Sequence, residues 1–345
     1  MHRQPVCSIS RFAAFAYPGL WPSPTLSSIS GCALPFSNKR RGFPVHSPRF
    51  SSQSSDAVSE AERVSNHSRP TAKKLVETEQ RGDVMLIGLN RPEKRNCVNE
   101  ATAKELLAAV TEFEENKSAK VGVLYGKGGY FCAGWDLSAL SGRDAEWVKS
   151  LPAFPALMGP TRNFINKPLI AAIQGYAVAG GLELSLMCDM RFMEEDAILG
   201  VFCRRYGVPL VDGGTVRLPA LIGLSRALDL ILTGRPVDAK EALSMGLVNR
   251  VVGRGSAIGE ALKAAQTIAR FPQECMLADR ESAYHSTFTA KSLEDALVFE
   301  HEKGKQIIIN EAIAGAKGFV FGLGKHGKFN FNAQKINDLV HSEKK

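Results

Sequence analysis

Apolar and polar residues alternate with two different periods in the middle of the chain. The segments 75–79 and 84–89 resemble strands on either side of Arg81-Gly-Asp83, and this pattern predicts a β-hairpin. Apolar residues then recur at helical spacing as far as Glu115, which predicts an amphipathic helix. The residues that set this spacing are Leu106, Leu107, Val110 and Phe113.

Strand-like and helix-like segments keep alternating after this helix. Strands are expected at 121–125, 168–173 and 190–193, and helices at 182–188 and 218–232. Strands that alternate with helices predict an α/β fold, in which helices wrap a parallel or mixed sheet.

The pattern becomes entirely helical from Gly259 onward, with apolar faces that include Ala261 and Ala265. We therefore assign residues 73–257 to an α/β core and residues 258–345 to a C-terminal helical region. Helices appended to such a core either cover a site or form a subunit interface.

Residues 1–55 differ in composition from the rest of the chain. They are rich in Ser, Pro and Arg, hold six basic residues and contain no Asp or Glu. This composition is typical of organellar transit peptides, and we expect the mitochondrial matrix as the destination, with processing near Arg49. A tail with no targeting role is the alternative. Residues 56–72 are polar and are interpreted as a linker.

Charge and cysteine content narrow the classes of function. The net charge of +8 comes mostly from the leader, since the remaining residues hold 37 basic and 35 acidic side chains, so no nucleic-acid partner is inferred. No apolar run is long enough to span a bilayer, so no membrane partner is expected. The seven cysteines show no CxxC pair and no zinc-like Cys/His spacing, and Gly126-Lys-Gly-Gly129 lacks the spacing of a dinucleotide loop. We expect no metal and no cofactor.

The most informative segment runs from Ile170 to Glu183, where an apolar run ends in glycines. A strand that passes into a helix at Gly180 leaves the first helical N–H groups facing a site. Glu183 then lies about one helical turn further on, beside those N–H groups. Anion-stabilising backbone next to a single acid suits proton transfer at a carbonyl compound. The alternative is a buried glutamate paired with an arginine.

A second strand-to-turn junction occupies residues 131–137. Gly134 permits a tight turn that leaves the N–H of Trp135 free, and Asp136 is suited to cap the helix that follows. Alone, this segment is an ordinary turn. Together with the Gly180 junction it supplies two backbone donors on separate elements, which is what an oxyanion hole requires.

Four motifs together resemble the enoyl-CoA hydratase/isomerase (crotonase) superfamily. They are Asn90-Arg-Pro-Glu-Lys-Arg-Asn96, Phe131-Cys-Ala-Gly-Trp-Asp136, the block 175–189 and Gly213-Gly-Thr215. The resemblance implies a crotonase-like spiral of ββα units, a homotrimer or dimer of trimers, and an acyl-CoA thioester as substrate. It also implies that the thioester oxygen binds the N–H groups of Trp135 and Gly180.

The chain departs from the hydratase pattern at the second carboxylate. Hydratases of the family resemble one another in carrying two glutamates; Glu183 matches the first, whereas Cys203 stands at the second position. We interpret Cys203 as a wall residue, because a reactive thiol would need a lowered pKa, for which Arg204 and Arg205 are the candidates. Asp212 matches an aspartate that dienoyl-CoA isomerases use in proton transfer. Its alternative role is to cap the following helix.

The resemblance also implies where coenzyme A binds, over the loop 90–98 and the turn 133–137. The residues expected to contact CoA or substrate are Lys94, Arg95, Cys97, Ala133, Asp136, Leu137 and Cys203. For the charged pair in this set, an exposed loop position is the alternative. Lys325, His326 and Lys328 are further candidates, contributed by a neighbouring subunit, with an exposed tail as the alternative for His326.

Three functions remain open. We favour an enoyl-CoA hydratase or isomerase that uses Glu183 together with Asp212. A CoA-thioester decarboxylase or hydrolase would account for the missing second glutamate. A non-catalytic homologue that binds acyl-CoA or RNA is the third; RNA binding calls for a lysine-rich helix face, and the glutamates around Lys104 and Lys117 argue against it.

Overall fold

The strands form a six-stranded sheet in the order β1-β2-β3-β4-β6-β8 and a separate two-stranded sheet of β5 and β7. The computed structural model describes residues 73–151, 155–328, 334–336 and 338. The strands are β1 (Val76–Arg81), β2 (Val84–Leu89), β3 (Val121–Gly126), β4 (Leu169–Ile173), β5 (Tyr176–Val178), β6 (Met190–Glu194), β7 (Ile198–Gly200) and β8 (Arg250–Val252). The helices are α1 (Glu100–Glu115), α2 (Leu137–Leu140), α3 (Ala145–Ser150), α4 (Gly180–Met187), α5 (Gly214–Ile222), α6 (Leu224–Thr233), α7 (Ala239–Ser244), α8 (Ala257–Ala269), α9 (Gln273–Phe288), α10 (Leu293–Ile307) and α11 (Ile313–Val320).

The pairing of the strands confirms the predicted hairpin and the predicted α/β class. β1 and β2 are antiparallel, whereas every other pair in the larger sheet is parallel. The helix expected from the apolar spacing is α1. Its first turn is capped by Asn99, whose side chain accepts a hydrogen bond from the Thr102 N–H at 3.0 Å.

The strands of the larger sheet are apolar on both faces because both faces are covered. In β2, Met85, Ile87 and Leu89 belong to one core, and Val84 and Leu86 belong to the other. The first core includes residues of α1, α4, α5 and α6, and the second is closed by α8. Two-sided burial explains why these strands appear in the sequence as continuous apolar runs and not as alternating ones.

Helix α8 lies beyond residue 257, where the sequence predicts that the core ends, yet it packs on the sheet. Ala261 and Ala265 are fully buried against Val123 and Ile170, and Ala257 belongs to the same core. The small alanine side chains allow the helix to approach the strands closely. The packed core therefore extends to Ala269, and only α9–α11 are appended to it.

Two segments that the sequence presents as continuous are broken by glycines. The helix expected at 218–232 is two helices, because Gly223, with φ of +81°, ends α5 and precedes α6. The apolar run that begins at Ile170 splits at Gly175, with φ of +55°, into β4 and β5. A positive φ is readily adopted by glycine and interrupts both kinds of regular element.

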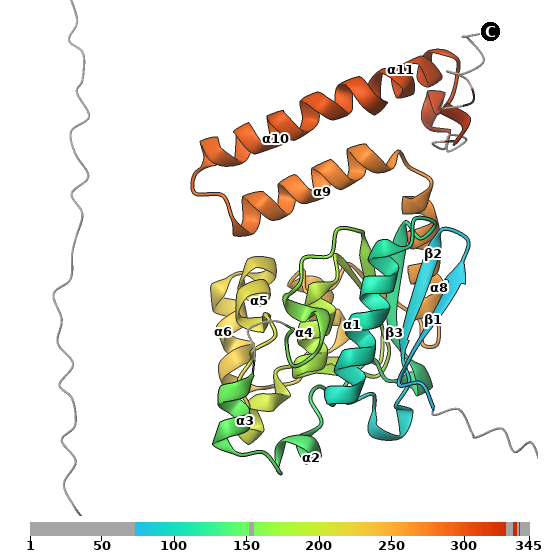
Figure 1. Cartoon of the computed structure of the whole chain (residues 1–345). Coiled ribbons are helices and arrows are strands. Elements are labelled where there is room, and N and C mark those ends of the chain that lie inside the picture. The colour runs from blue at the N-terminus through green and yellow to red at the C-terminus, as the bar shows by residue number, and fades with distance from the viewer. Residues whose placement is uncertain (1–72, 152–154, 329–333, 337, 339–345) are drawn as a thin grey trace, which may run out of the picture. The chain divides into compact units, whose positions relative to one another are not determined.

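Helices α9 and α10 run side by side and carry the chain away from the sheet (Figure 1). With α11 they form the C-terminal helical region that the sequence predicts. Many of their large apolar residues are exposed, including Leu293, Ile313 and Val320. Among the described residues, no helix combines the length and apolar character needed to cross a membrane.

Candidate active site

An apolar cavity of about 560 Å³ lies where the two strand-to-turn junctions meet. Its walls come from the turn at 133–137, from α2 and α3, from the start of α4 and from segments near 156 and 208. Seven of the predicted site residues line it: Ala133, Trp135, Leu137, Gly180, Glu183, Cys203 and Asp212. Motifs far apart in the sequence thus share one cavity.

The turn that leads into α4 holds a strained backbone. Ala179 has φ of +54° and ψ of −127°, a backbone conformation that residues other than glycine rarely adopt. This turn directs the N–H of Gly180, the first residue of α4, out of the ladder of helical hydrogen bonds. A Cβ at Gly180 would lie 2.7 Å from the Met158 sulfur, so a larger residue at this position would displace the Met158 side chain.

The Trp135 turn lies directly against the Gly180 turn. A Cβ at Gly134 would lie 3.0 Å from the Gly180 nitrogen and 2.9 Å from the Ala179 Cβ, and Gly134 has φ of +94°. In the described part of the chain, neither the Trp135 N–H nor the Gly180 N–H donates a hydrogen bond. The cavity wall therefore carries two adjacent, unpaired backbone donors, and such donors can stabilise an oxyanion.

Glu183 is held by backbone N–H groups of a different element. Its Oε1 accepts hydrogen bonds from the Asp212 N–H at 2.9 Å and from the Gly214 N–H at 2.8 Å. Gly214 is the first residue of α5, so the carboxyl group lies at the positive end of that helix. The side chain is not paired with an arginine, as the alternative interpretation required; within the described residues it has no salt bridge.

Burial raises the pKa of Glu183 to about 7, and the negative charge of Asp212 contributes to the same shift. The two backbone N–H groups oppose the shift because they stabilise the ionised form. Glu183 is only 2% exposed. A carboxyl group with a pKa near neutrality can both accept and donate a proton at physiological pH, as a general acid–base requires.

Asp212 also lines the cavity, but the groups that bind its carboxylate differ from those that bind Glu183. Its Oδ1 accepts hydrogen bonds from the Met158 N–H at 2.9 Å and from the Thr161 hydroxyl at 2.5 Å. Burial raises the pKa of Asp212 despite these hydrogen bonds. Asp212 does not cap α5, because that helix has Gly213 at its N-cap without a side-chain hydrogen bond. The capping role considered for Asp212 is therefore wrong.

The thiol of Cys203 is neutral at physiological pH. Burial raises its pKa, and the charge of Glu183 raises it further, which outweighs the opposing effect of Arg204. The cysteine is 8% exposed and lines the cavity. The structure thus provides no activated thiolate, and Cys203 forms part of the wall.

Comparisons with known proteins identify the family. The family model described as enoyl-CoA hydratase/isomerase matches residues 79–324. A probable enoyl-CoA hydratase of Rhizobium meliloti is 37% identical over 239 residues, which cover 69% of this chain and 90% of that protein. A probable mitochondrial enoyl-CoA hydratase of Dictyostelium discoideum is 37% identical over 57% of this chain and 70% of its own. The crystal structure of an enoyl-CoA hydratase from Mycobacterium tuberculosis matches with a TM-score of 0.67 at 31% identity, over 72% of this chain and 96% of that one.

The chain belongs to the enoyl-CoA hydratase/isomerase family. It is therefore an acyl-CoA-processing enzyme, and the resemblance seen in its four motifs is confirmed. The match to solved enoyl-CoA hydratases also confirms the crotonase-like fold with its C-terminal helical region.

Four residues expected at the CoA end of this hydratase/isomerase site lie outside the cavity lining. Lys94 and Arg95 are exposed on the loop between β2 and α1, and Cys97 is half-buried beside them. Asp136 caps α2 as predicted, and its carboxylate also pairs with Arg91 at 3.0 Å. The ion pair ties the loop 90–97 to the turn that presents the Trp135 N–H.

The cavity described above also contains residues that the sequence patterns did not indicate. Met158 and Thr161 hold the Asp212 carboxylate, and Trp147, Leu151 and Tyr206 contribute much of the apolar wall. These residues lie in irregular or short segments, where periodicity gives no indication of which side chains face inward. Lys325, His326 and Lys328 lie near the end of α11, outside this cavity lining.

Proposed function

We propose that this enzyme shifts the double bond of an unsaturated acyl-CoA thioester by proton transfer through Glu183 and Asp212. The observation that carries the proposal is the placement of two buried carboxyl groups on one cavity, beside two unpaired backbone N–H groups. A double-bond shift needs a proton removed at one carbon and returned at another. Two carboxyl groups at different points of the wall suit this requirement.

Each group has a distinct role in the proposed reaction. Ionised Glu183 accepts a proton from the α-carbon of a 3-enoyl thioester, and the electron pair moves toward the thioester oxygen. The N–H groups of Trp135 and Gly180 stabilise the resulting enolate, and each such donor typically contributes about 10²–10³ in rate. Protonated Glu183 then gives this proton to the γ-carbon, either directly or by way of the Asp212 carboxylate, which leaves a conjugated 2-enoyl thioester and an ionised Glu183.

Hydration of a 2-enoyl thioester is the second candidate. The Rhizobium and Dictyostelium relatives are both named as probable enoyl-CoA hydratases, which favours this reaction. Against it stands the neutral thiol of Cys203, at the position where the family resemblance leads us to expect a second glutamate. Hydration would then require Asp212 to take part in activating the water.

The absorbance of the conjugated thioester distinguishes the two reactions. With 3-hexenoyl-CoA we expect the absorbance to rise, and with crotonyl-CoA we expect it to stay constant. Glu183→Gln should lower kcat for the isomerisation by about 10²–10⁴. Glu112→Gln, an exposed position on α1, is the matched control and should leave kcat unchanged. Loss of absorbance from crotonyl-CoA would establish hydration instead, and no change with either substrate would overturn both.

We also propose that the enzyme is a homotrimer. The exposed apolar residues of α6 support an assembly, since Leu224 and Leu232 are 65% and 69% exposed. Light scattering on the purified protein should give about three times the 37.4 kDa of one full-length chain. Six times that mass would indicate a dimer of trimers, and a single chain mass would contradict the proposal.

We infer that residues 1–55 direct the protein to the mitochondrial matrix. Their acid-free, arginine-containing composition and the mitochondrial Dictyostelium relative support this inference. A fluorescent protein fused behind these residues should enter mitochondria. Replacing the basic residues of the leader by glutamine should leave the fusion in the cytosol, whereas import of this variant would contradict the proposal.

A further inference from the structure

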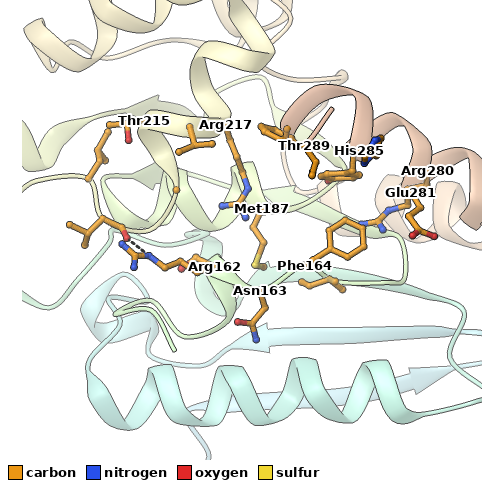
Figure 2. Close-up of a pocket in the computed structure, with 18 of the residues that line it drawn as sticks. Arg162, Asn163, Phe164, Met187, Thr215, Arg217, Arg280, Glu281, His285 and Thr289 are labelled. Atoms are coloured by element: carbon orange, nitrogen blue, oxygen red, sulfur yellow. Dashed lines mark hydrogen bonds between the residues drawn. The ribbon is translucent and has the colours of Figure 1, made fainter. Parts of the chain in front are cut away.

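A second cavity lies on the other side of the chain segment that carries Asp212. Its volume is about 720 Å³, larger than the cavity described above and within the range of small-molecule sites. It is bounded by the segment 161–165, by α5 and by α9 (Figure 2). Phe299 of α10 also lines it. Val211 and Arg162 line both cavities.

Arg217 reaches into this second cavity without an acidic partner. Figure 2 shows its side chain extending from α5 toward Met187, between Arg162 on one side and Arg280 on the other. In the described residues its guanidinium makes one hydrogen bond, a long one of 3.3 Å to the Asp212 carbonyl oxygen, and no salt bridge. Burial lowers the pKa of Arg217, which reflects the cost of holding this charge away from water. A guanidinium has five N–H donors, so most of those of Arg217 have no partner among the described residues.

The other charged groups of the cavity are already neutralised in pairs or hydrogen-bonded. Arg280 binds Asp189 at 2.8 Å, and Glu281 binds Lys303 at 2.7 Å. The Arg162 guanidinium donates to the Val211 carbonyl oxygen at 2.8 Å. Arg217, by contrast, forms no salt bridge with a described carboxylate; Glu183 and Asp212 act on its charge only from a distance.

The remaining wall is apolar and aromatic. The aromatic residues that line the cavity are Phe164, Tyr284, Phe288 and Phe299, and Met187 lines it with them. The His285 ring stacks on Phe299 with a centroid distance of 4.0 Å; its buried Nε2 has no hydrogen-bond partner within the described structure, and the Asp295 carboxylate lies 3.9 Å from it. A ligand with an anionic end and an apolar body matches this combination of one unbalanced cation and aromatic walls.

We propose that the second cavity is a binding site for a small monocarboxylate with an apolar tail, held by a charge-assisted hydrogen bond from Arg217. The site is distinct from the acyl-CoA cavity and does not depend on which reaction the enzyme performs. Arg217 binds the carbonyl of Asp212, whose N–H binds Glu183, so the ligand would lie directly behind both carboxyl groups.

Sodium octanoate is the probe, measured by isothermal titration calorimetry on the full-length protein. We expect saturable binding that persists when the acyl-CoA cavity is filled with saturating butyryl-CoA. Replacing the carboxylate by an alcohol, in 1-octanol, should weaken binding by about 10–100-fold, because the charge-assisted bond is lost.

Two variants test the assignment independently. Arg217→Met removes the cation at similar volume and should weaken octanoate binding by about 10–100-fold. Phe288→Glu adds an acid to the wall at a position that is 45% exposed, and should weaken binding without disturbing the core. Phe319→Glu, a 55% exposed position on α11 outside the cavity lining, is the matched control and should bind octanoate as the parent does.

Several results would overturn the proposal. They are the absence of saturable octanoate binding, displacement by butyryl-CoA, equal binding of 1-octanol, or unchanged binding in both Arg217→Met and Phe288→Glu. A crystal structure of the assembled protein in which a carboxylate of another subunit pairs with the Arg217 guanidinium would also overturn it.

Discussion

At the scale of single residues, the electrostatics of Glu183 control what the site can do. Water is excluded from the carboxyl group, and Asp212 lies close enough to oppose its ionisation. Two backbone N–H groups nevertheless keep one oxygen fixed. The result is an oriented carboxyl group whose pKa is near neutrality, and this has separate consequences for activity and for stability.

The activity should depend on the ionisation of Glu183. If Glu183 is the base, kcat/KM will fall as the pH drops below about 7, because protonation removes the acceptor. A pH profile of kcat/KM measures this directly. A constant kcat/KM between about pH 5 and 8 would show that Glu183 is not the base.

The stability should depend on the same group with a defined sign. The pKa of Glu183 is raised on folding from 4.5 to about 7, so the folded state binds the proton more tightly and loses stability as the pH rises through this window. Glu183→Gln stays neutral and should be more stable than the parent at pH 8 by about 1–3 kcal/mol. At about pH 4 the difference should vanish. Urea unfolding at both pH values tests this, and equal stability at pH 8 would contradict it.

At the scale of elements, the site depends on two turns packed against each other. One precedes α2 and the other precedes α4, and each uses a positive φ to turn an N–H toward the cavity. Neither turn alone supplies two donors, so the proposed oxyanion hole requires both. The two turns are too close for a Cβ at Gly134, so the two donors can lie this near each other only because residue 134 is a glycine.

Gly134→Ala should therefore impair catalysis more than folding. The added Cβ would meet the Ala179 Cβ at 2.9 Å and push the two turns apart, with an expected loss of about 10²–10³ in kcat. Gly129→Ala is the matched control, because Gly129 also has a positive φ, of +82°, but has nothing within 4 Å of a Cβ. The control should lose about 1 kcal/mol of stability and keep its kcat. Equal kcat in the two variants would contradict this account.

At the scale of the whole molecule, the larger sheet is buried on both faces, and one cavity lies on each side of the segment 211–213. The acyl-CoA cavity and the Arg217 cavity share Val211 and Arg162 in their walls. Among the described residues, those that build both cavities and both cores begin at Val76. The enzyme should therefore fold and react without the segments that the sequence assigns to a leader and a linker.

Deletion of residues 1–72 should leave Tm and kcat unchanged. Deletion of residues 1–82 is the matched control, because it also removes β1, whose Val76 is 6% exposed and belongs to the core. The second deletion should lower Tm, since β1 pairs with β2 along its whole length. Scanning calorimetry and an activity assay compare the two. A lower Tm after the shorter deletion would contradict this division of the chain.

Much of the fold follows from local patterns in the sequence. The hairpin, α1, the parallel strands and the C-terminal helices are set by apolar periodicity and by turn residues, which act over a few neighbouring residues. The motifs around Gly134 and Gly180 also indicate the donor pair and Glu183, because glycines at a strand-to-helix junction have few other uses. The boundary expected at residue 257 placed α8 outside the core. An alanine-rich helix has the same sequence pattern whether it packs on a sheet or lies in an appended region, so the pattern could not show this contact.

The sequence by itself determined the α/β class, the family motifs and the candidate carboxyl groups, because each is encoded in residues close together in the chain. Only the tertiary structure decided what those groups do. It gave Asp212 its contacts with Met158 and Thr161 in place of a helix cap, raised the pKa of Glu183 and left Arg217 without an acidic partner. Desolvation and the distance between charges depend on which distant segments pack together, and no local pattern specifies them.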